Sequence, residues 1–291
     1  MARRGKVLAV LTDYAFLTVA VGTLILALAS SMVGTITVLT KQSLIGDMLG
    51  HAAYPGVVFA FMVFQSRQPL LLMLGAMLSG YVSYRLVYWI ANHRRQSLIN
   101  ALALVSAAFF GLGMVLKQFV QGNPTFANSS QAGLQTYLFG QAAFIKKADV
   151  ILIIGVSVVC LALYGIYYQR YRLMLFDPVH AQLSGVSVKT LDFLTRLMMI
   201  ALISVGLKVV GAILMSAFLI APASLGLLWG KTYGQSLRLA AALASVSALT
   251  GSYISSLVSG MSTGPSIIVT MSAIALMIWT VKRGLGRSNH V

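Results

Sequence analysis

The stretch Ser43–Gly56 reads SLIGDMLGHAAYPG and opens an apolar segment that continues to Phe64. It contains Asp47 and His51, which a helix would place one turn apart on the same face. The whole chain has only five acidic residues, all of them Asp, and four His. Placing one of each inside a membrane-length apolar segment costs free energy, so this pair indicates a functional site.

The same stretch carries signals for close helix packing. Gly46 and Gly50 form a GxxxG pair, which allows a second helix backbone to come close. Pro55 and Gly56 follow, and they are expected to bend or break the helix just beyond His51. We therefore expect the carboxylate and the imidazole to lie beside a close-packed, kinked point.

Composition places the chain in a membrane. Its 291 residues are 58% hydrophobic and 9% charged, whereas soluble domains have about 25% charged residues. One transmembrane domain, residues 1–291, can account for this length. The net charge of +16 comes from basic residues in short loops between apolar runs, as in cytoplasmic loops of membrane proteins. No basic face or pattern of base-stacking aromatic residues accompanies it, so nucleic-acid binding is not expected.

Long apolar runs follow one another with short breaks, and they predict an all-α, polytopic bundle with about eight or nine spans. Most are long enough to cross about 30 Å of hydrocarbon as helices. The run 134–145 reaches only about 18 Å as a helix, so we expect a re-entrant helix on the outer side. The runs cover residues 14–39, 44–66, 69–90, 98–120, 134–145, 150–168, 191–207, 209–229, 236–259 and 265–281.

The direction of the first span stays open. Basic residues near Arg94, Arg170 and Lys231 mark cytoplasmic loops, and the uncharged stretch 121–133 reads as external. Counting back from Arg94 places the N-terminus outside if both 14–39 and 44–66 cross the membrane. The basic residues before position 14 argue for the opposite side. Because the apolar run after them is too long for a signal peptide, it is expected to be a span.

The stretch Phe176–Ser187, FDPVHAQLSGVS, predicts a short cytoplasmic helix over 177–187. Asp177 suits the N-cap, Pro178 the first helical position, and Gly185 the end of the helix. It is either an ordinary connector or a lever that docks into a cytoplasmic partner. The capped helix in the largest cytoplasmic loop favours the second interpretation.

The stretch 205–224, VGLKVVGAILMSAFLIAPAS, follows this helix. Lys208 interrupts an apolar region, and we expect it at a membrane interface with its side chain extending outward. Pro222 is expected to bend or end the next span. The sole cysteine, Cys160, excludes an internal disulfide and is expected to pack as a small apolar residue.

Three motifs together, SLIGDxxxHAAxPG, FDPxxAxxxGV and KVVGAILMSAFLIAPAS, resemble the membrane subunits of ABC-type metal-ion importers for manganese, zinc or iron. The likeness covers nearly the whole chain. It implies a pair of permeases in the bacterial cytoplasmic membrane, cytoplasmic ATPase subunits and an external metal-binding protein. It also implies that Asp47 and His51 contact the metal, and that the segment with Asp177, Pro178, Ala181 and Gly185 contacts the ATPase.

The chemistry of Asp47 and His51 allows a structural ion pair or metal ligands. One oxygen and one nitrogen are too few to replace a hydration shell, but a twofold dimer would supply two carboxylates and two imidazoles. That set suits manganese, iron or zinc, with manganese expected first, and it is weak enough to release the ion. The 14 Met are scattered, and Met48 is expected to face away from Asp47, so copper is not favoured.

The chain itself is not expected to be an enzyme. It lacks GxxxxGK[ST] for binding nucleotide phosphates, and it lacks the hydrolase motifs GxSxG and HExxH. Energy for transport must then come from a partner ATPase or from an ion gradient. The alternative to an ATP-driven permease is a proton-coupled secondary cation transporter in which Asp47 relays protons.

Overall fold

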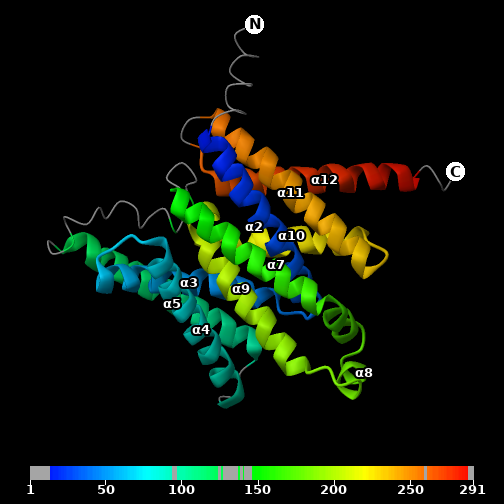
Figure 1. Ribbon diagram of the computed structural model, residues 1–291, viewed down its shortest axis with the longest axis horizontal. Coiled ribbons are helices and arrows are strands. Elements are labelled where there is room, and N and C mark those ends of the chain that lie inside the picture. The colour runs from blue at the N-terminus through cyan, green and yellow to red at the C-terminus, as the bar shows by residue number, and fades with distance from the viewer. Residues whose placement is uncertain are drawn as a thin grey trace, which may run out of the picture.

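A computed structural model describes residues 14–93, 97–123, 126, 137, 140, 146–258 and 261–287. This part of the chain is built of helices without strands (Figure 1). Eight helices are long and apolar enough to cross a bilayer, and α10 is a shorter apolar helix. The all-α transmembrane prediction is therefore confirmed. The helices are α2 (Tyr14–Leu39), α3 (Ser43–Phe64), α4 (Pro69–His93), α5 (Leu98–Gly122), α7 (Lys147–Phe176), α8 (Pro178–Leu183), α9 (Val188–Val210), α10 (Ala212–Trp229), α11 (Tyr233–Leu257) and α12 (Thr263–Arg287).

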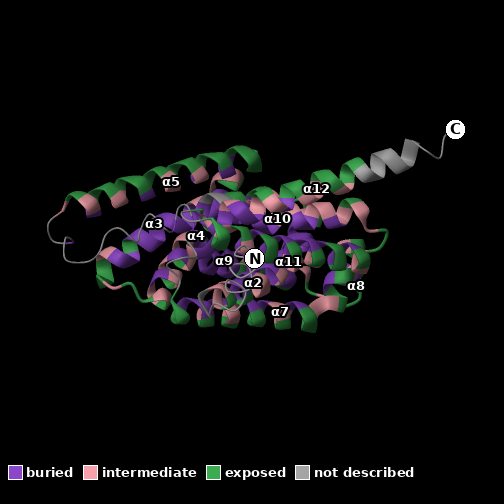
Figure 2. Cartoon of the chain, turned by 90° about the horizontal axis from the view of Figure 1, so that it is seen from above, coloured by how far each residue is buried: buried purple, intermediate pink, exposed green. Residues whose placement is uncertain are grey.

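The helices form a bundle in which α2 packs against α7, α9, α10 and α11. Figure 2 shows α5 along one flank of the bundle and α7 along the opposite flank. Most of the buried apolar side chains of the described helices join in one cluster. The expected re-entrant helix over 134–145 lies, apart from Tyr137 and Gly140, outside the described residues. So does most of the stretch 121–133 that reads as external.

Buried hydroxyl groups on α2, with the exception of that of Ser30, form hydrogen bonds within the protein, as a membrane interior favours. Thr35 and Thr37 donate to carbonyl oxygens one turn back along the helix. Thr23 lies 3.2 Å from Ser252 on α11, oxygen to oxygen, and joins the two helices. Such contacts let small polar residues hold helices together where hydrophobic burial gives little driving force.

Two prolines lie inside helices that continue past them. Pro55 does not break α3, which ends only at Phe64, and Pro222 does not end α10. In α3 a neighbouring helix supplies hydrogen bonding beside the proline, since Ser79 on α4 donates to the carbonyl oxygen of Ala52 over 2.6 Å. Pro55 removes the backbone donor for the carbonyl oxygen of His51, the residue before Ala52, and hydrogen bonds from packed neighbours in this region help membrane helices to tolerate proline.

Lys208 does not extend outward from a membrane interface, contrary to the prediction. Its Nζ lies 2.5 Å from Oδ2 of Asp149, at the start of α7. The side chains are 17% and 4% exposed, respectively. Oδ2 of Asp149 also accepts a hydrogen bond from the backbone N–H of Lys146. A buried carboxylate nearby explains the difference, because it gives the ammonium group a partner inside the protein.

A second charged pair joins α9 to α4. Asp192 and Arg196 lie one turn apart on α9, with 3.6 Å between a carboxylate oxygen and a guanidinium nitrogen. The guanidinium carbon of Arg196 lies 5.1 Å and 5.7 Å from the ring centroids of Tyr84 and Tyr88 on α4. Arg196 also donates a hydrogen bond to the hydroxyl of Tyr84. The cation therefore fastens two helices by charge and by cation–π contact.

Candidate functional site

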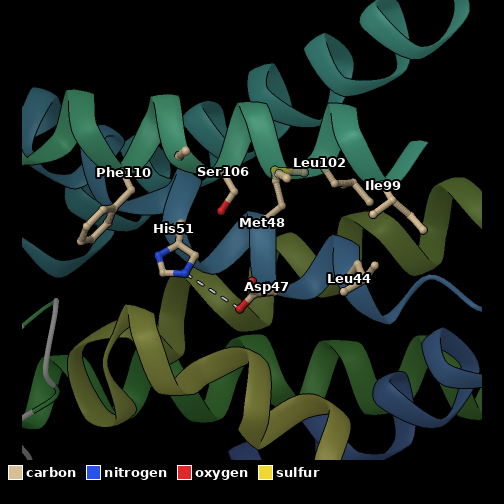
Figure 3. Close-up of a pocket in the computed structure, with 10 residues that line it drawn as sticks. Leu44, Asp47, Met48, His51, Ile99, Leu102, Ser106 and Phe110 are labelled. Atoms are coloured by element: carbon tan, nitrogen blue, oxygen red, sulfur yellow. Dashed lines mark ion pairs between the residues drawn. The ribbon is translucent and has the colours of Figure 1, made fainter. Parts of the chain in front are cut away.

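A cleft of about 370 Å³ lies between α3 and α5, on the α5 flank of the bundle (Figure 3). Asp47 and His51, the two metal ligands predicted from the sequence, both line this cleft. Apolar side chains form most of the wall, and Ser106 on α5 adds a hydroxyl. The lining residues are Leu44, Asp47, Met48, His51, Ile99, Leu102, Ala103, Ser106, Ala107 and Phe110.

Asp47 and His51 point to the same side of α3, as their spacing predicts (Figure 3). Nε2 of His51 lies 3.9 Å from Oδ1 of Asp47, and the side chains are 23% and 52% exposed, respectively. This separation is too long for a strong hydrogen bond. The pair is therefore loosely held, and the carboxylate is accessible from the cleft.

Each side chain keeps a polar atom that has no partner among the described residues. Nδ1 of His51 is buried without a hydrogen-bond partner within the described structure. Oδ2 of Asp47 has no hydrogen bond or ion pair to a described residue. The contacts of Asp47 with His51 and Ser216 are both made by Oδ1. The exposed carboxylate of Asp47, with Oδ2 free, fits a group that binds a passing ligand better than a finished structural pair, whereas Nδ1 of His51 is enclosed by the protein.

Ser216 on α10 contacts the pair, and sequence reasoning missed it. Its Oγ donates a hydrogen bond to Oδ1 of Asp47 over 3.0 Å. A serine in the apolar stretch AILMSAFLI carries no signal of its own, because buried serines usually bond to their own helix. Here the hydroxyl bridges α3 and α10 and orients the carboxylate.

Met48 faces another way than Asp47, as predicted, but its side chain also lines the cleft. Figure 3 shows it between α3 and α5, beside Leu102, whereas Asp47 lies on another side of α3. Phe110 closes the other end, with its ring centroid 5.2 Å from that of His51 in an edge-to-face arrangement. Met48 and Phe110 thus give the cleft apolar walls next to its two ionisable groups.

Glycines set how closely α3 approaches its neighbours. A Cβ added at Gly50 would lie 2.8 Å from the carbonyl oxygen of Ala212, so α10 approaches α3 there. A Cβ at Gly46 would meet only side-chain atoms at 3.8 Å or more, so the close backbone approach predicted for the pair is found at Gly50 and not at Gly46. Gly56 instead faces the backbone of Gly75 on α4. Close backbone contact on the α10 side of α3 brings Ser216 within reach of Asp47.

The cleft of one chain is an incomplete site for a metal ion. Within the described ranges no group of three or more His, Cys, Asp or Glu side chains is placed to hold one. Asp47 and His51 offer a carboxylate and an imidazole, which manganese, iron and zinc all accept. A second copy of the pair would be needed to complete a coordination shell.

The short helix α8 is built as its sequence predicts, although it ends at Leu183. Oδ1 of Asp177 accepts hydrogen bonds from the backbone N–H groups of Val179 and His180, at 2.9 and 3.0 Å. Gly185 takes φ +79° after the helix, a conformation that favours glycine. Ala181 is fully buried against the chain itself, while Val179 and Leu183 are exposed. The surface open to a partner therefore combines these apolar side chains with the exposed polar side chains of His180 and Gln182.

A family model described as the ABC 3 transport family matches residues 12–282. The chain belongs to this family. It is accordingly a multi-pass protein of the bacterial cytoplasmic membrane, with eight helices of spanning length in the described part. Membership of an ABC family also favours the ATP-driven hypothesis over the proton-coupled one.

Known proteins are similar to this chain over most of its length. It is 36% identical over 266 residues to "Zinc transport system membrane protein TroC" of Treponema pallidum, covering 91% of this chain and 88% of that one. It is 35% identical over 266 residues to "Manganese transport system membrane protein MntC" of Bacillus subtilis, covering 91% of this chain and 60% of that longer protein. The structure "PsaBC from Streptococcus pneumoniae in complex with Fab" shares the fold, with a TM-score of 0.82, 23% identity and 94% coverage of both chains.

Proposed function

We propose that this protein is the permease of an ATP-driven importer for a divalent transition metal, with manganese expected first and zinc or iron as alternatives. The observation that carries the proposal is the cleft lined by Asp47 and His51, into which the half-exposed carboxylate of Asp47 opens. Relatives named for zinc and manganese transport support the same class of cargo. The metal is a transported substrate and not a resident cofactor.

Two copies of the pair would complete the site. Two permeases facing each other through the α5 flank would bring together two carboxylates and two imidazoles, either as a homodimer or with a sister permease. Asp47 is half exposed in the single chain, which leaves its carboxylate accessible to such a partner. A mixed oxygen and nitrogen set binds manganese, iron or zinc and still releases the ion.

Ser216 acts in this proposal as a positioning residue. Its hydroxyl holds Oδ1 of Asp47 and leaves Oδ2 toward the metal. Outer partners of this kind fix the direction of a ligand, and their loss typically lowers metal affinity about 10- to 100-fold. The hydrogen bond comes from α10, so movement of α10 relative to α3 would change the site.

The energy for transport comes from partner chains in this proposal. Cytoplasmic ATPase subunits hydrolyse ATP, and they dock on α8 through exposed Val179 and Leu183. Asp177 and Pro178 start the helix and Gly185 ends it, so these three residues set its shape and not its contacts. An external metal-binding protein delivers the ion to the opposite side of the membrane.

Metal uptake by the reconstituted transporter tests the proposal. Vesicles holding this permease, its ATPase and its binding protein should take up ⁵⁴Mn only with ATP, and Asp47→Ala and His51→Ala should reduce uptake to background. His93→Ala is the matched control, because His93 lies at an exposed helix end and stacks on Trp89. Normal uptake by both site variants would contradict the assignment of the site.

A further inference from the structure

A second groove, of about 780 Å³, lies where α2, α7 and α10 end and α11 begins. It is separate from the cleft that holds Asp47, and it shares no lining residue with that cleft. Its walls combine basic, polar and apolar side chains. The lining residues are Leu39, Gln169, Arg172, Leu173, Leu175, Phe176, Leu227, Gly230, Lys231, Thr232, Tyr233 and Ser236.

The groove carries two positive charges that no carboxylate of the described residues neutralises. Arg172 is on α7 and Lys231 is in the short connection between α10 and α11. Both are exposed, and neither forms an ion pair with a carboxylate anywhere in residues 14–93, 97–123, 146–258 or 261–287. Gln169 and Thr232 add polar groups to the same wall. The groove is therefore suited to a ligand with negative charge.

Most of the remaining lining residues are apolar. Leu39 and Leu227 come from the last turns of two membrane helices, α2 and α10. Phe176 is 93% exposed at the end of α7. Unpaired cations next to exposed apolar side chains match a ligand that has both a negative charge and hydrophobic chains. A free phosphate or a nucleotide has the charge but no hydrophobic chain.

The groove lies at the cytoplasmic edge of the bilayer. Its end of the bundle also carries Arg170, Lys189 and Arg238, and such enrichment in basic residues marks the cytoplasmic side. The thirty residues of α7 extend about 45 Å, which is longer than a hydrocarbon core of about 30 Å. The last turns of α7, which line the groove, therefore reach the level of the lipid headgroups.

The groove also faces away from the proposed contact with a second permease. Its α7 wall lies on the flank opposite to α5, as Figure 2 shows. Pairing through the α5 flank would leave the α7 flank in contact with lipid. This step rests on the proposed function, whereas the charge and shape of the groove do not.

We propose that this groove binds an anionic phospholipid of the inner leaflet. The phosphate lies between Arg172 and Lys231, and the acyl chains run along Leu39 and Leu227 toward the bilayer. A lipid fits better than an acidic segment of the ATPase because the apolar wall continues into two membrane helices. Bound lipid would join the ends of α7 and α10 next to α8.

Native mass spectrometry of the purified permease, exposed to phosphatidylglycerol or to phosphatidylcholine with the same acyl chains, tests this inference. The wild type should retain phosphatidylglycerol in preference to phosphatidylcholine. The double variant Arg172→Gln/Lys231→Gln should bind phosphatidylglycerol about 25-fold more weakly, about fivefold for each cation lost.

The matched control is Arg170→Gln/Arg238→Gln. It removes two positive charges from α7 and α11 at the same end of the bundle, from residues that do not line the groove. The control should bind lipid like the wild type, and soluble glycerophosphoglycerol should not displace the lipid. Equal loss in both double variants would overturn the site in favour of a general charge effect. Unchanged lipid binding in Arg172→Gln/Lys231→Gln, with loss of ATPase co-purification, would overturn it in favour of a protein partner.

Discussion

Asp47–His51 and Asp149–Lys208 are both acid–base pairs, but the protein holds them in opposite ways. The first pair is 3.9 Å apart and opens into a cleft, with Asp47 52% exposed. The second is 2.5 Å apart, with Asp149 only 4% exposed and bound also by a backbone N–H group. A tight, satisfied pair stabilises structure, whereas a loose one with unused atoms can accept a ligand.

The two pairs are linked through one junction in the chain. Lys208 lies in the last turn of α9, three residues before Gly211, which takes φ +93° and starts α10. Ser216 follows in α10 and holds Asp47. The buried pair therefore fixes the start of the helix that orients the open pair. Charged groups in a membrane protein can thus serve as the frame of a site as well as its ligands.

Breaking the buried pair should have the largest effect on stability. Asp149→Ala leaves the ammonium group of Lys208 buried without its partner, which should lower the free energy of unfolding by about 3–5 kcal/mol. Asp47→Ala should change it by less than about 1 kcal/mol, because that pair is open to solvent. Thermal unfolding of the purified protein in detergent measures both.

The double variant Asp149→Leu/Lys208→Met separates charge from packing. Replacing both members of a buried pair by apolar side chains is often neutral, so this variant should recover most of the lost stability. If Asp149→Ala unfolds at the wild-type temperature while Asp47→Ala does not, the contrast between the two pairs is wrong.

Local sequence signals predicted much of this molecule. The apolar run 98–120 corresponds to α5 over Leu98–Gly122, and Asp177 caps α8 as its type and position indicate. The spacing of Asp47 and His51 placed both on one face of α3. These features depend on residues close together in the chain, where helix geometry alone decides the arrangement.

Contacts between distant residues were not predictable in the same way. Lys208 meets Asp149 across 59 positions, and Ser216 meets Asp47 across 169. A lysine in an apolar run looks the same whether it extends to the interface or pairs inside the bundle. Helix packing decides between these outcomes, and local sequence patterns do not show which helices pack together.

Glycine variants of α3 should sharpen the comparison with an intermediate effect. Gly50→Ala places a Cβ 2.8 Å from the carbonyl oxygen of Ala212, so α3 and α10 must separate. Overpacking of this kind costs about 1–3 kcal/mol, and it should also weaken metal binding by moving Ser216 away from Asp47. Isothermal titration with Mn²⁺ and thermal unfolding check both effects.

Gly46→Ala is the matched control on the same helix face. Its Cβ would meet side-chain atoms at 3.8 Å, an ordinary contact. Replacing glycine by alanine inside a helix should raise stability by up to about 1 kcal/mol, with metal affinity unchanged. Equal loss of affinity in both variants would show that the approach of α10 is not what matters.

The smallest effect is expected for Ser216→Ala, which removes one hydroxyl and leaves the packing intact. Because Asp47 is half exposed, water can partly replace the lost hydrogen bond. We therefore expect an affinity for Mn²⁺ about tenfold lower, at the weak end of the effect of outer-shell residues, with unfolding temperature nearly unchanged. Ser216→Thr keeps the hydroxyl and should bind like the wild type. A hydroxyl that only packs would give unchanged affinity in both variants, and Asp47 would then be oriented by α3 alone.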